Sequence, residues 1–563
     1  MNREACAIGI VINSIIILLI YLFSIRWHIY LPITFFWLAV VLILGTISYQ
    51  SYQCKLLPAY AKIVVLEIAA TCVVFHLIYQ IPYYGLYGAD SYWDLVSAKG
   101  IMETGFLLSD PEYLNVTSFF PIIHIIGATF SLISGIGIFH VAKWFPSLLG
   151  FVTILLLYLT TRDIFRNETI ALLSILLFSC LQHYILFGSL FVRETIAIAL
   201  MMCSIYLLFS NRYSSHAEIY RTLSIIFLML VVLAHHLTSF MLLLFLLVQF
   251  MVNKVNDHHF SNFICFDNEV FGEKIGISFI LLAISLVLAY WTYVIFSPLY
   301  SLITFFLSLF GREPQASFLQ TANIDPAEIL TLRGFIIFYG FHIFILIFGI
   351  ILFYQILQKS RKKRVEMYSF TIFLYICGIL GLFGLYLSNI PAFPDRMLIY
   401  GWIMGFPPLV MGILNTRRKT LLIIGQALLF SFMLFNIYMI TPASWDTGSR
   451  DIAAAPSEQE YALAHTFDFS NQTIIAYSNT LLAIFDLYNV EGIDIHLLTK
   501  IRQINFTNFI ISKKIYADEM EPPPLITDLH YNAKMVEAIK YYNSRGYKIY
   551  DSNEVSLFRT RKV

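Results

Sequence analysis

Short polar segments interrupt a largely apolar sequence, and their side chains are of the types that bind phosphate groups and accept hydroxyl protons. Seven of these side chains are candidates for a functional site: Asp90, Asp94, Arg193, Glu194, His235, His236 and Arg396. A carboxylate can accept the proton of a hydroxyl group. A guanidinium group donates two parallel hydrogen bonds to a phosphate. The candidate residues therefore indicate chemistry between a phosphate-bearing molecule and a hydroxyl group.

The spacing of these residues adds detail to the hypothesis. Asp90 and Asp94 are four residues apart, so they share one face if the segment is a helix. Arg193 and Glu194 are adjacent, so they do not share a helix face and are not expected simply to neutralise each other. Arg396 precedes an apolar stretch, at a membrane edge where a lipid phosphate would lie.

Structural roles remain open for the same residues. Asp90 is of a type favoured at a helix N-cap, and Leu95, Ala98 and Met102 are available to lie against lipid on the helix that it would begin. The two adjacent histidines can cap a helix end, and Arg396 can be an interfacial anchor. These roles are compatible with a functional site.

Composition predicts that the site belongs to a membrane protein. Of the 563 residues, 59% are hydrophobic and only 13% are charged, against about 25% charged in an ordinary soluble domain. The formal net charge of +1 gives no basic field for a nucleic acid, so we expect no nucleic-acid partner. The cysteines form no CxxC pair, which argues against a structural zinc site.

Hydropathy predicts an α-helical polytopic membrane domain over residues 1–440. A spanning helix needs about 20 mostly apolar residues, and about thirteen segments qualify. The predicted spans are 7–25, 32–48, 63–80, 142–160, 170–187, 194–210, 222–235, 237–252, 275–295, 332–356, 368–387, 397–414 and 420–440. We interpret 119–138 as an interfacial or re-entrant element within a long first external segment, 81–141.

Lysine and arginine in alternate loops predict the orientation. The basic cluster at residues 359–364 is taken as cytoplasmic, because short cytoplasmic loops retain positive charge. The N-terminus is then cytoplasmic and residues 441–563 form an extracytoplasmic soluble domain. Predicted strands at 473–477, 509–516 and 547–550, with helices at 479–488 and 532–546, indicate an α/β or α+β fold for this domain.

This layout resembles the GT-C class of integral-membrane glycosyltransferases, which use polyprenyl-phosphate-linked sugars. The resemblance rests on the acidic first external loop at Asp90, on Arg193-Glu194 at the start of a later span, and on the external C-terminal domain. It implies that Asp90 faces the acceptor, as a base or beside a metal. The absence of a WWDYG motif disfavours the oligosaccharyltransferase subgroup, and Ser91 after Asp90 disfavours a protein hydroxyl acceptor.

The sequence hypothesis is thus a cell-membrane glycosyltransferase that moves a sugar, with inversion, from a polyprenyl-phosphate donor to an acceptor hydroxyl on a glycan, lipid or protein. Asp90 and Glu194 are the catalytic candidates, and the arginines, the two histidines and Asp94 are the candidates for binding donor phosphate or substrate. Asp90 and Glu194 also offer hard oxygen ligands for a divalent cation, Mg²⁺ or Mn²⁺. The alternatives are a polymerase or ligase of lipid-linked glycans and a polytopic transporter.

Overall fold

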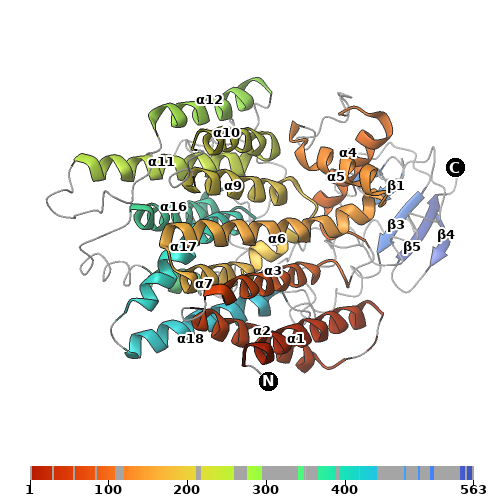
Figure 1. The fold of residues 1–563 in the computed structure, drawn as a ribbon. Coiled ribbons are helices and arrows are strands. Elements are labelled where there is room, and N and C mark those ends of the chain that lie inside the picture. The colour runs from red at the N-terminus through yellow and green to blue at the C-terminus, as the bar shows by residue number, and fades with distance from the viewer. Residues whose placement is uncertain are drawn as a thin grey trace.

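The computed structural model of the 563-residue chain is predominantly helical (Figure 1). It describes residues 3–27, 29, 31–54, 58–82, 85–107, 119–210, 217–258, 276–294, 340, 342–347, 349, 365–388, 392–416, 419–440, 474–476, 492–494, 508–512, 546–551 and 555–560. The predicted span at 332–356 is described only in part, and the basic cluster at 359–364 and the two predicted C-terminal helices lie outside the described residues.

The helices follow the apolar segments of the sequence closely. They are α1 (Arg3–Arg26), α2 (Ile33–Gln53), the 3₁₀ helix η1 (Pro58–Tyr60), α3 (Ala61–Leu77), α4 (Ala89–Thr104), α5 (Ile122–Ser134), α6 (Ile138–Phe165), α7 (Glu168–Ser179), α8 (Gln182–Ser189), α9 (Arg193–Ser210), α10 (Ala217–Ala234), α11 (His236–His258), α12 (Ile277–Tyr293), α16 (Val365–Ser388), α17 (Ala392–Leu414) and α18 (Lys419–Met439).

Within the described residues, eight helices are long and apolar enough to cross a membrane. The number rises to nine if α7 and α8, which are bent by 65° at their junction, form one broken span. Helix α5 has 13 residues, so it is about 20 Å long and shorter than the roughly 30 Å hydrocarbon core. The chain is therefore a helical, multi-pass membrane protein.

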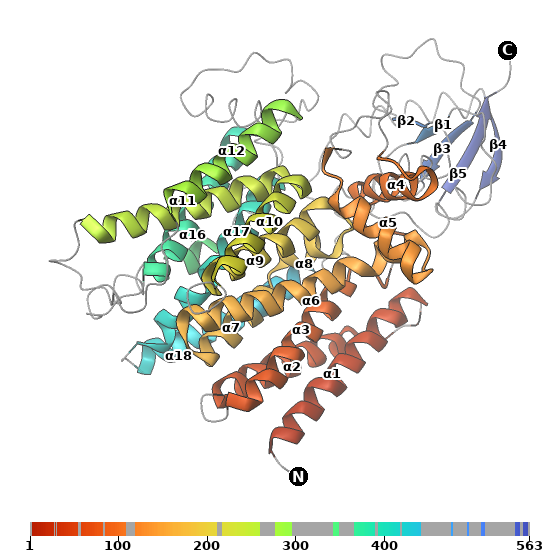
Figure 2. The same ribbon diagram turned by 45° about the horizontal axis from the view of Figure 1, so that its top comes forward.

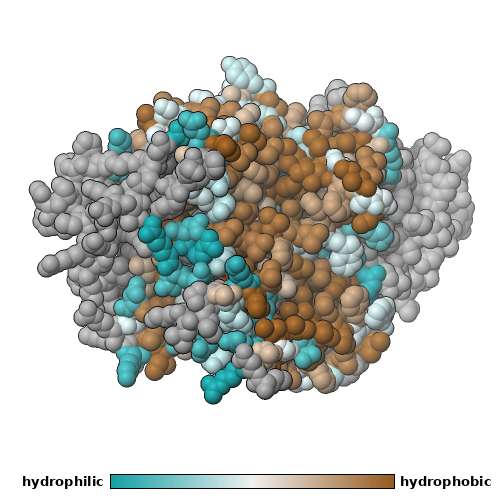
Figure 3. All heavy atoms as spheres, viewed as in Figure 1, coloured by the Kyte–Doolittle hydropathy of each residue, from teal (hydrophilic) through white to brown (hydrophobic). Residues whose placement is uncertain are grey.

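The surface of the helical region agrees with a lipid environment. Large apolar side chains are exposed along α1 and α2, for example Ile12, Ile16 and Leu38. In the space-filling view, apolar residues cover much of the described part of the visible face (Figure 3). In water such an apolar surface would promote aggregation, whereas contact between apolar side chains and lipid tails is not unfavourable.

The break between α7 and α8 is stabilised by a side chain from a distant helix. Where a helix is interrupted within a membrane, the freed backbone groups need other partners. The backbone N–H of Gln182, at the start of α8, donates to Oδ1 of Asn436 on α18 at 3.0 Å. Helix α8 is thereby held at an angle to α7, and it leads the chain toward the start of α9 (Figure 2).

Helices α4 and α5 pack together at one end of the helical region, as both ribbon views show (Figures 1 and 2). Leu95 and Ala98 of α4 are fully buried in a cluster with Ile123 of α5 and Phe191, which precedes α9. The expectation that Leu95 and Ala98 lie against lipid is therefore wrong, because α5 covers that face of α4. A Cβ at Gly127 of α5 would lie 2.7 Å from the Phe191 ring, so glycine permits this close packing.

The C-terminal region contains a five-stranded mixed sheet of order β2-β1-β3-β5-β4. Its strands are β1 (Ile474–Ala476), β2 (Gly492–Asp494), β3 (Asn508–Ser512), β4 (Gly546–Asp551) and β5 (Val555–Thr560). β1 pairs in parallel with β2 and β3, while β5 runs antiparallel to β3 and β4. β1, β3 and β4 coincide with the three predicted strands, and both ribbon views place the sheet near α4 and α5.

Candidate functional site

Polar side chains from five parts of the chain meet at the ends of helices near α4. They come from α4, α5, the N-terminus of α9, the turn between α10 and α11, and the N-terminal part of α17. These elements bring together six of the seven candidates from the sequence, namely Asp94, Arg193, Glu194, His235, His236 and Arg396. The seventh, Asp90, lies one helical turn before Asp94 on α4.

Asp94 is fully buried and binds two cation-forming side chains through one oxygen. Its Oδ1 lies 2.8 Å from Nε2 of His124 on α5 and 3.4 Å from Nε of Arg193. Its Oδ2 is buried and accepts no hydrogen bond within the described part of the chain. Asp94 thus fixes Arg193, whose guanidinium group also lies 5.9 Å from the centre of the Phe120 ring.

Glu194 forms a second, similar pair on the other side of the α9 N-terminus. Its Oε2 lies 3.2 Å from Nε of Arg396, and its Oε1 accepts a hydrogen bond of 2.9 Å from the Tyr400 hydroxyl. The Glu194 side chain is 3% exposed, whereas that of Arg396 is 27% exposed. Arg193 and Glu194 therefore pair with different partners, as expected for neighbours that do not share a helix face.

The turn between α10 and α11 continues the hydrogen-bonded network. The Thr238 hydroxyl lies 2.6 Å from the Tyr400 hydroxyl and 2.9 Å from Nδ1 of His235. The His236 ring lies 4.7 Å from the His235 ring and 5.4 Å from the Phe120 ring, centre to centre. The two histidines thus pack against each other next to Phe120 and the Thr238–Tyr400 hydrogen bond.

His235 is held in its neutral form. Burial lowers the pKa of His235 well below its usual range, and the charges of His236, Arg396 and Arg193 add to this effect. A neutral imidazole has one nitrogen that donates a hydrogen bond and one that accepts. His235 can therefore accept a hydrogen bond without adding positive charge to the site.

Asp90 is exposed, in contrast to Asp94. The residue at the N-cap of α4 is Gly88, which has a φ of 81°, and no side chain caps this helix end. The expectation that Asp90 is the N-cap is therefore wrong, because the helix starts at Ala89, two residues earlier than that role requires. Asp90 instead lies in the first turn, about 6 Å along the helix axis from Asp94.

The arrangement does not fit a metal bound through Glu194. Both oxygens of this carboxylate are already engaged, by Tyr400 and by Arg396. No group of three or more His, Cys, Asp and Glu side chains in the described part of the chain could hold a metal ion. Within the described residues, the hypothesis of a divalent cation between Asp90 and Glu194 thus finds no matching donor set.

Three contributors were missed at the sequence level: His124, Thr238 and Tyr400. Tyr400 is four residues after Arg396 and Thr238 is three after His235, so helical spacing could have suggested both. His124 lies in the segment read only as an apolar interfacial element. Its contact with Asp94, 30 residues away, depends on how α5 folds back over α4.

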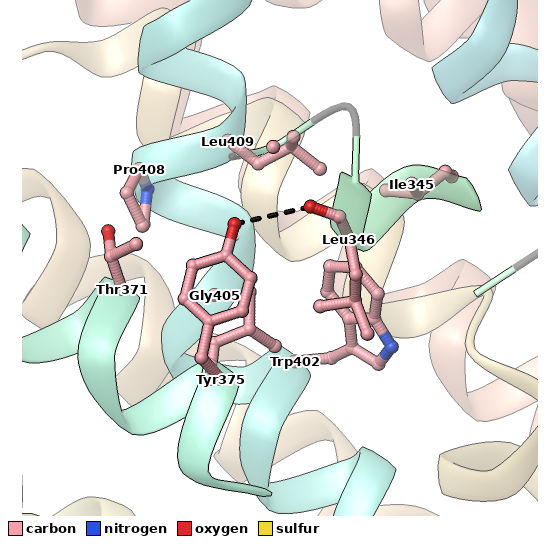
Figure 4. A pocket seen from close by; sticks show the side chains of 10 residues that line it. Ile345, Leu346, Thr371, Tyr375, Trp402, Gly405, Pro408 and Leu409 are labelled. Carbon is pink, nitrogen blue, oxygen red and sulfur yellow. Dashed lines mark hydrogen bonds between the residues drawn. The ribbon is translucent and has the colours of Figure 1, made fainter. Parts of the chain in front are cut away.

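A separate pocket lies between α16, α17 and the segment 342–347 (Figure 4). Its lining is mainly apolar, with side chains such as Leu374, Leu409 and Trp402. Tyr375 donates a hydrogen bond of 3.2 Å to the backbone carbonyl of Leu346 across it. This pocket contains no acid, base or cation, so it is not the catalytic candidate.

Comparisons with known proteins were made by sequence and by structure. No protein-family model and no curated protein matches the sequence. The Archaeoglobus fulgidus oligosaccharyltransferase in its apo form has a TM-score of 0.52 and 13% identity, over 88% of this chain and 74% of that chain. The same enzyme tethered to an acceptor peptide with the NVT sequon gives a TM-score of 0.51, with equal identity and coverage. ArnT from Cupriavidus metallidurans bound to undecaprenyl phosphate gives 0.48 and 11% identity, over 88% of this chain and 98% of that chain.

The chain therefore has the fold of the GT-C glycosyltransferases. This confirms, at the level of the fold, the resemblance that the sequence indicates. At 13% identity the likeness does not carry over substrates, and it does not distinguish between subgroups of the class.

Proposed function

We propose that the protein is a membrane glycosyltransferase that moves a sugar from a polyprenyl-phosphate donor to an acceptor hydroxyl on the extracytoplasmic side. The proposal is carried by one observation: on a GT-C fold, two arginines are each held by a buried carboxylate, and the exposed Asp90 lies one helical turn from one of these carboxylates, Asp94. One structural neighbour is an oligosaccharyltransferase, and one of its structures carries an acceptor peptide, which makes glycosyl transfer the reaction type to test first.

The proposed role of Arg193 and Arg396 is to bind the phosphate of the donor. Each guanidinium group is fixed on one side by a carboxylate and remains partly exposed, 16% for Arg193 and 27% for Arg396. A cation positioned in advance stabilises the negative charge that develops on a departing phosphate. Glu194 and Asp94 act in this proposal as positioning residues, because their own oxygens are buried.

Asp90 is the proposed base. Its exposed carboxylate takes the proton from the acceptor hydroxyl, whose oxygen attacks the anomeric carbon. The bond from that carbon to the phosphate oxygen breaks, and the lipid phosphate leaves with the electron pair. A single displacement of this kind inverts the anomeric centre, and it needs no carboxylate nucleophile.

The proposal includes the membrane arrangement expected from the sequence. The N-terminus is cytoplasmic, the chain has about thirteen spans, and residues 441–563 form an external α/β or α+β domain next to the site. The position of the sheet near α4 and α5 supports a domain that contributes to acceptor binding (Figure 2). The plasma membrane is the proposed location.

The test is turnover of labelled polyprenyl-phosphate sugars by the purified protein in lipid nanodiscs. Release of lipid phosphate together with a new glycoside supports the proposal, and Arg396→Ala is the matched inactive control. A transporter would move substrate between compartments without breaking the bond from sugar to phosphate. A polymerase or ligase of lipid-linked glycans would join glycans from a lipid-linked donor and would retain activity in Asp90→Asn.

A further inference from the structure

An ion pair followed by a continuous row of hydrogen bonds connects Arg396 with His235 across three helices. It runs from Arg396 to Glu194 (3.2 Å), to Tyr400 (2.9 Å), to Thr238 (2.6 Å) and to Nδ1 of His235 (2.9 Å). All members except Arg396 are nearly or fully buried. Each hydroxyl in such a row has only one hydrogen to donate, so the direction of the hydrogen bond at one end fixes the direction at the other end.

The ion pair at one end fixes the direction of the hydrogen bonds. Next to the Arg396 guanidinium group Glu194 is ionised, and an ionised carboxylate only accepts. Tyr400 must therefore donate to Glu194, which leaves its oxygen to accept from Thr238. Since Thr238 uses its hydrogen in this way, its oxygen accepts from Nδ1–H of His235.

The opposite arrangement is also complete, but it needs a neutral Glu194. The acid would donate to Tyr400, Tyr400 to Thr238, and Thr238 to an unprotonated Nδ1 of His235. The backbone N–H of Thr238 lies 3.4 Å from that nitrogen and would favour this arrangement. This contact is longer than the 2.9 Å hydroxyl contact, and a proton on Glu194 would cancel its attraction to Arg396.

We propose that His235 carries its proton on Nδ1 and presents Nε2 as a hydrogen-bond acceptor to a hydroxyl group of the substrate. A neutral imidazole with hydrogen on Nδ1 has its lone pair on Nε2. The network therefore makes His235 a recognition residue for a polyhydroxylated ligand, which a sugar is, at the end of the network opposite Arg396. The substrate part of this inference rests on the proposed function, whereas the position of the proton does not.

Nitrogen-15 NMR of histidine-labelled protein in nanodiscs tests the position of the proton. The His235 signals are assigned by their loss in His235→Gln. We expect a protonated Nδ1 and an unprotonated Nε2 in the wild type and in Thr238→Ser, which keeps the hydroxyl. In Thr238→Val, which removes it at nearly equal volume, the preference for this tautomer should weaken. Hydrogen on Nε2 in the wild type would overturn the proposal, whatever the outcome of any transfer assay.

Steady-state kinetics with the donor that is turned over test the contact with substrate. His235→Gln places an amide oxygen where Nε2 lies, whereas His235→Phe keeps a ring without an acceptor. One lost hydrogen bond predicts about a tenfold lower kcat/KM for the phenylalanine variant, with partial recovery in the glutamine variant. Equal kcat/KM in the wild type and His235→Phe would contradict the substrate contact while leaving glycosyl transfer itself established.

Discussion

The two aspartates of α4 allow a matched test, because they lie on one helix face but in opposite environments. Asp90 is exposed and is not the N-cap, so Asp90→Asn removes only a charge near the helix N-terminus. Such a charge contributes about 0.3–1 kcal/mol, which bounds the expected loss of stability. If Asp90 is the base, sugar transfer should fall by about two to four decades.

Asp94→Asn is the comparison variant, in which a loss of stability is expected in addition to any loss of transfer. Asp94 is fully buried against His124 and Arg193, and removing one partner from a buried ion pair costs about 3–5 kcal/mol. We expect this variant to show a clear drop in thermal stability in detergent, whereas Asp90→Asn should unfold near the wild-type temperature. Both variants would be assayed for transfer of labelled sugar at a temperature where both remain folded. A fully active Asp90→Asn enzyme would refute the assignment of the base.

Other predictions concern the phosphate, the pH dependence and the topology. Arg396→Ala should strongly weaken use of the donor. Arg396→Lys should restore only part of it, because lysine cannot donate the two parallel hydrogen bonds of a guanidinium group. Unchanged donor dependence in both variants would assign Arg396 to anchoring. Because the pKa of His235 is lower in the folded than in the unfolded protein, stability should fall as the pH drops below the ordinary histidine range. His235→Gln should lack this component in thermal unfolding curves. Impermeant thiol reagents added from outside should label a cysteine introduced near Ser457 and not one near Lys362, and the reverse pattern would invert the topology.

Much of the membrane region is predictable from sequence because lipid imposes one simple requirement. A span needs about 20 apolar residues and must satisfy its own backbone, so α1, α2 and α9 could be placed from composition alone. The candidate site was predictable in part for a related reason. Charges such as Arg193 and Glu194 are expensive near lipid, so they stand out where they occur.

The partners within the site could not be predicted, since they depend on packing between distant segments. Nothing in the sequence connects Glu194 with Tyr400, which are 206 residues apart. The burial of Asp94 depends on α5 lying over α4, and this packing makes Asp94 the more important of the two aspartates for stability. Sequence spacing placed Asp90 and Asp94 on one face correctly, but it could not show that only one of them is covered.

The central claim is that this site binds the phosphate of a polyprenyl-linked donor. It is tested most directly by a cryo-electron microscopy structure of the protein in nanodiscs with saturating polyprenyl phosphate. We predict density for the phosphate within hydrogen-bonding distance of the Arg193 or Arg396 guanidinium group, on the side of Asp90. Phosphate density at the opposite membrane face, or an empty site at saturating lipid, would contradict it.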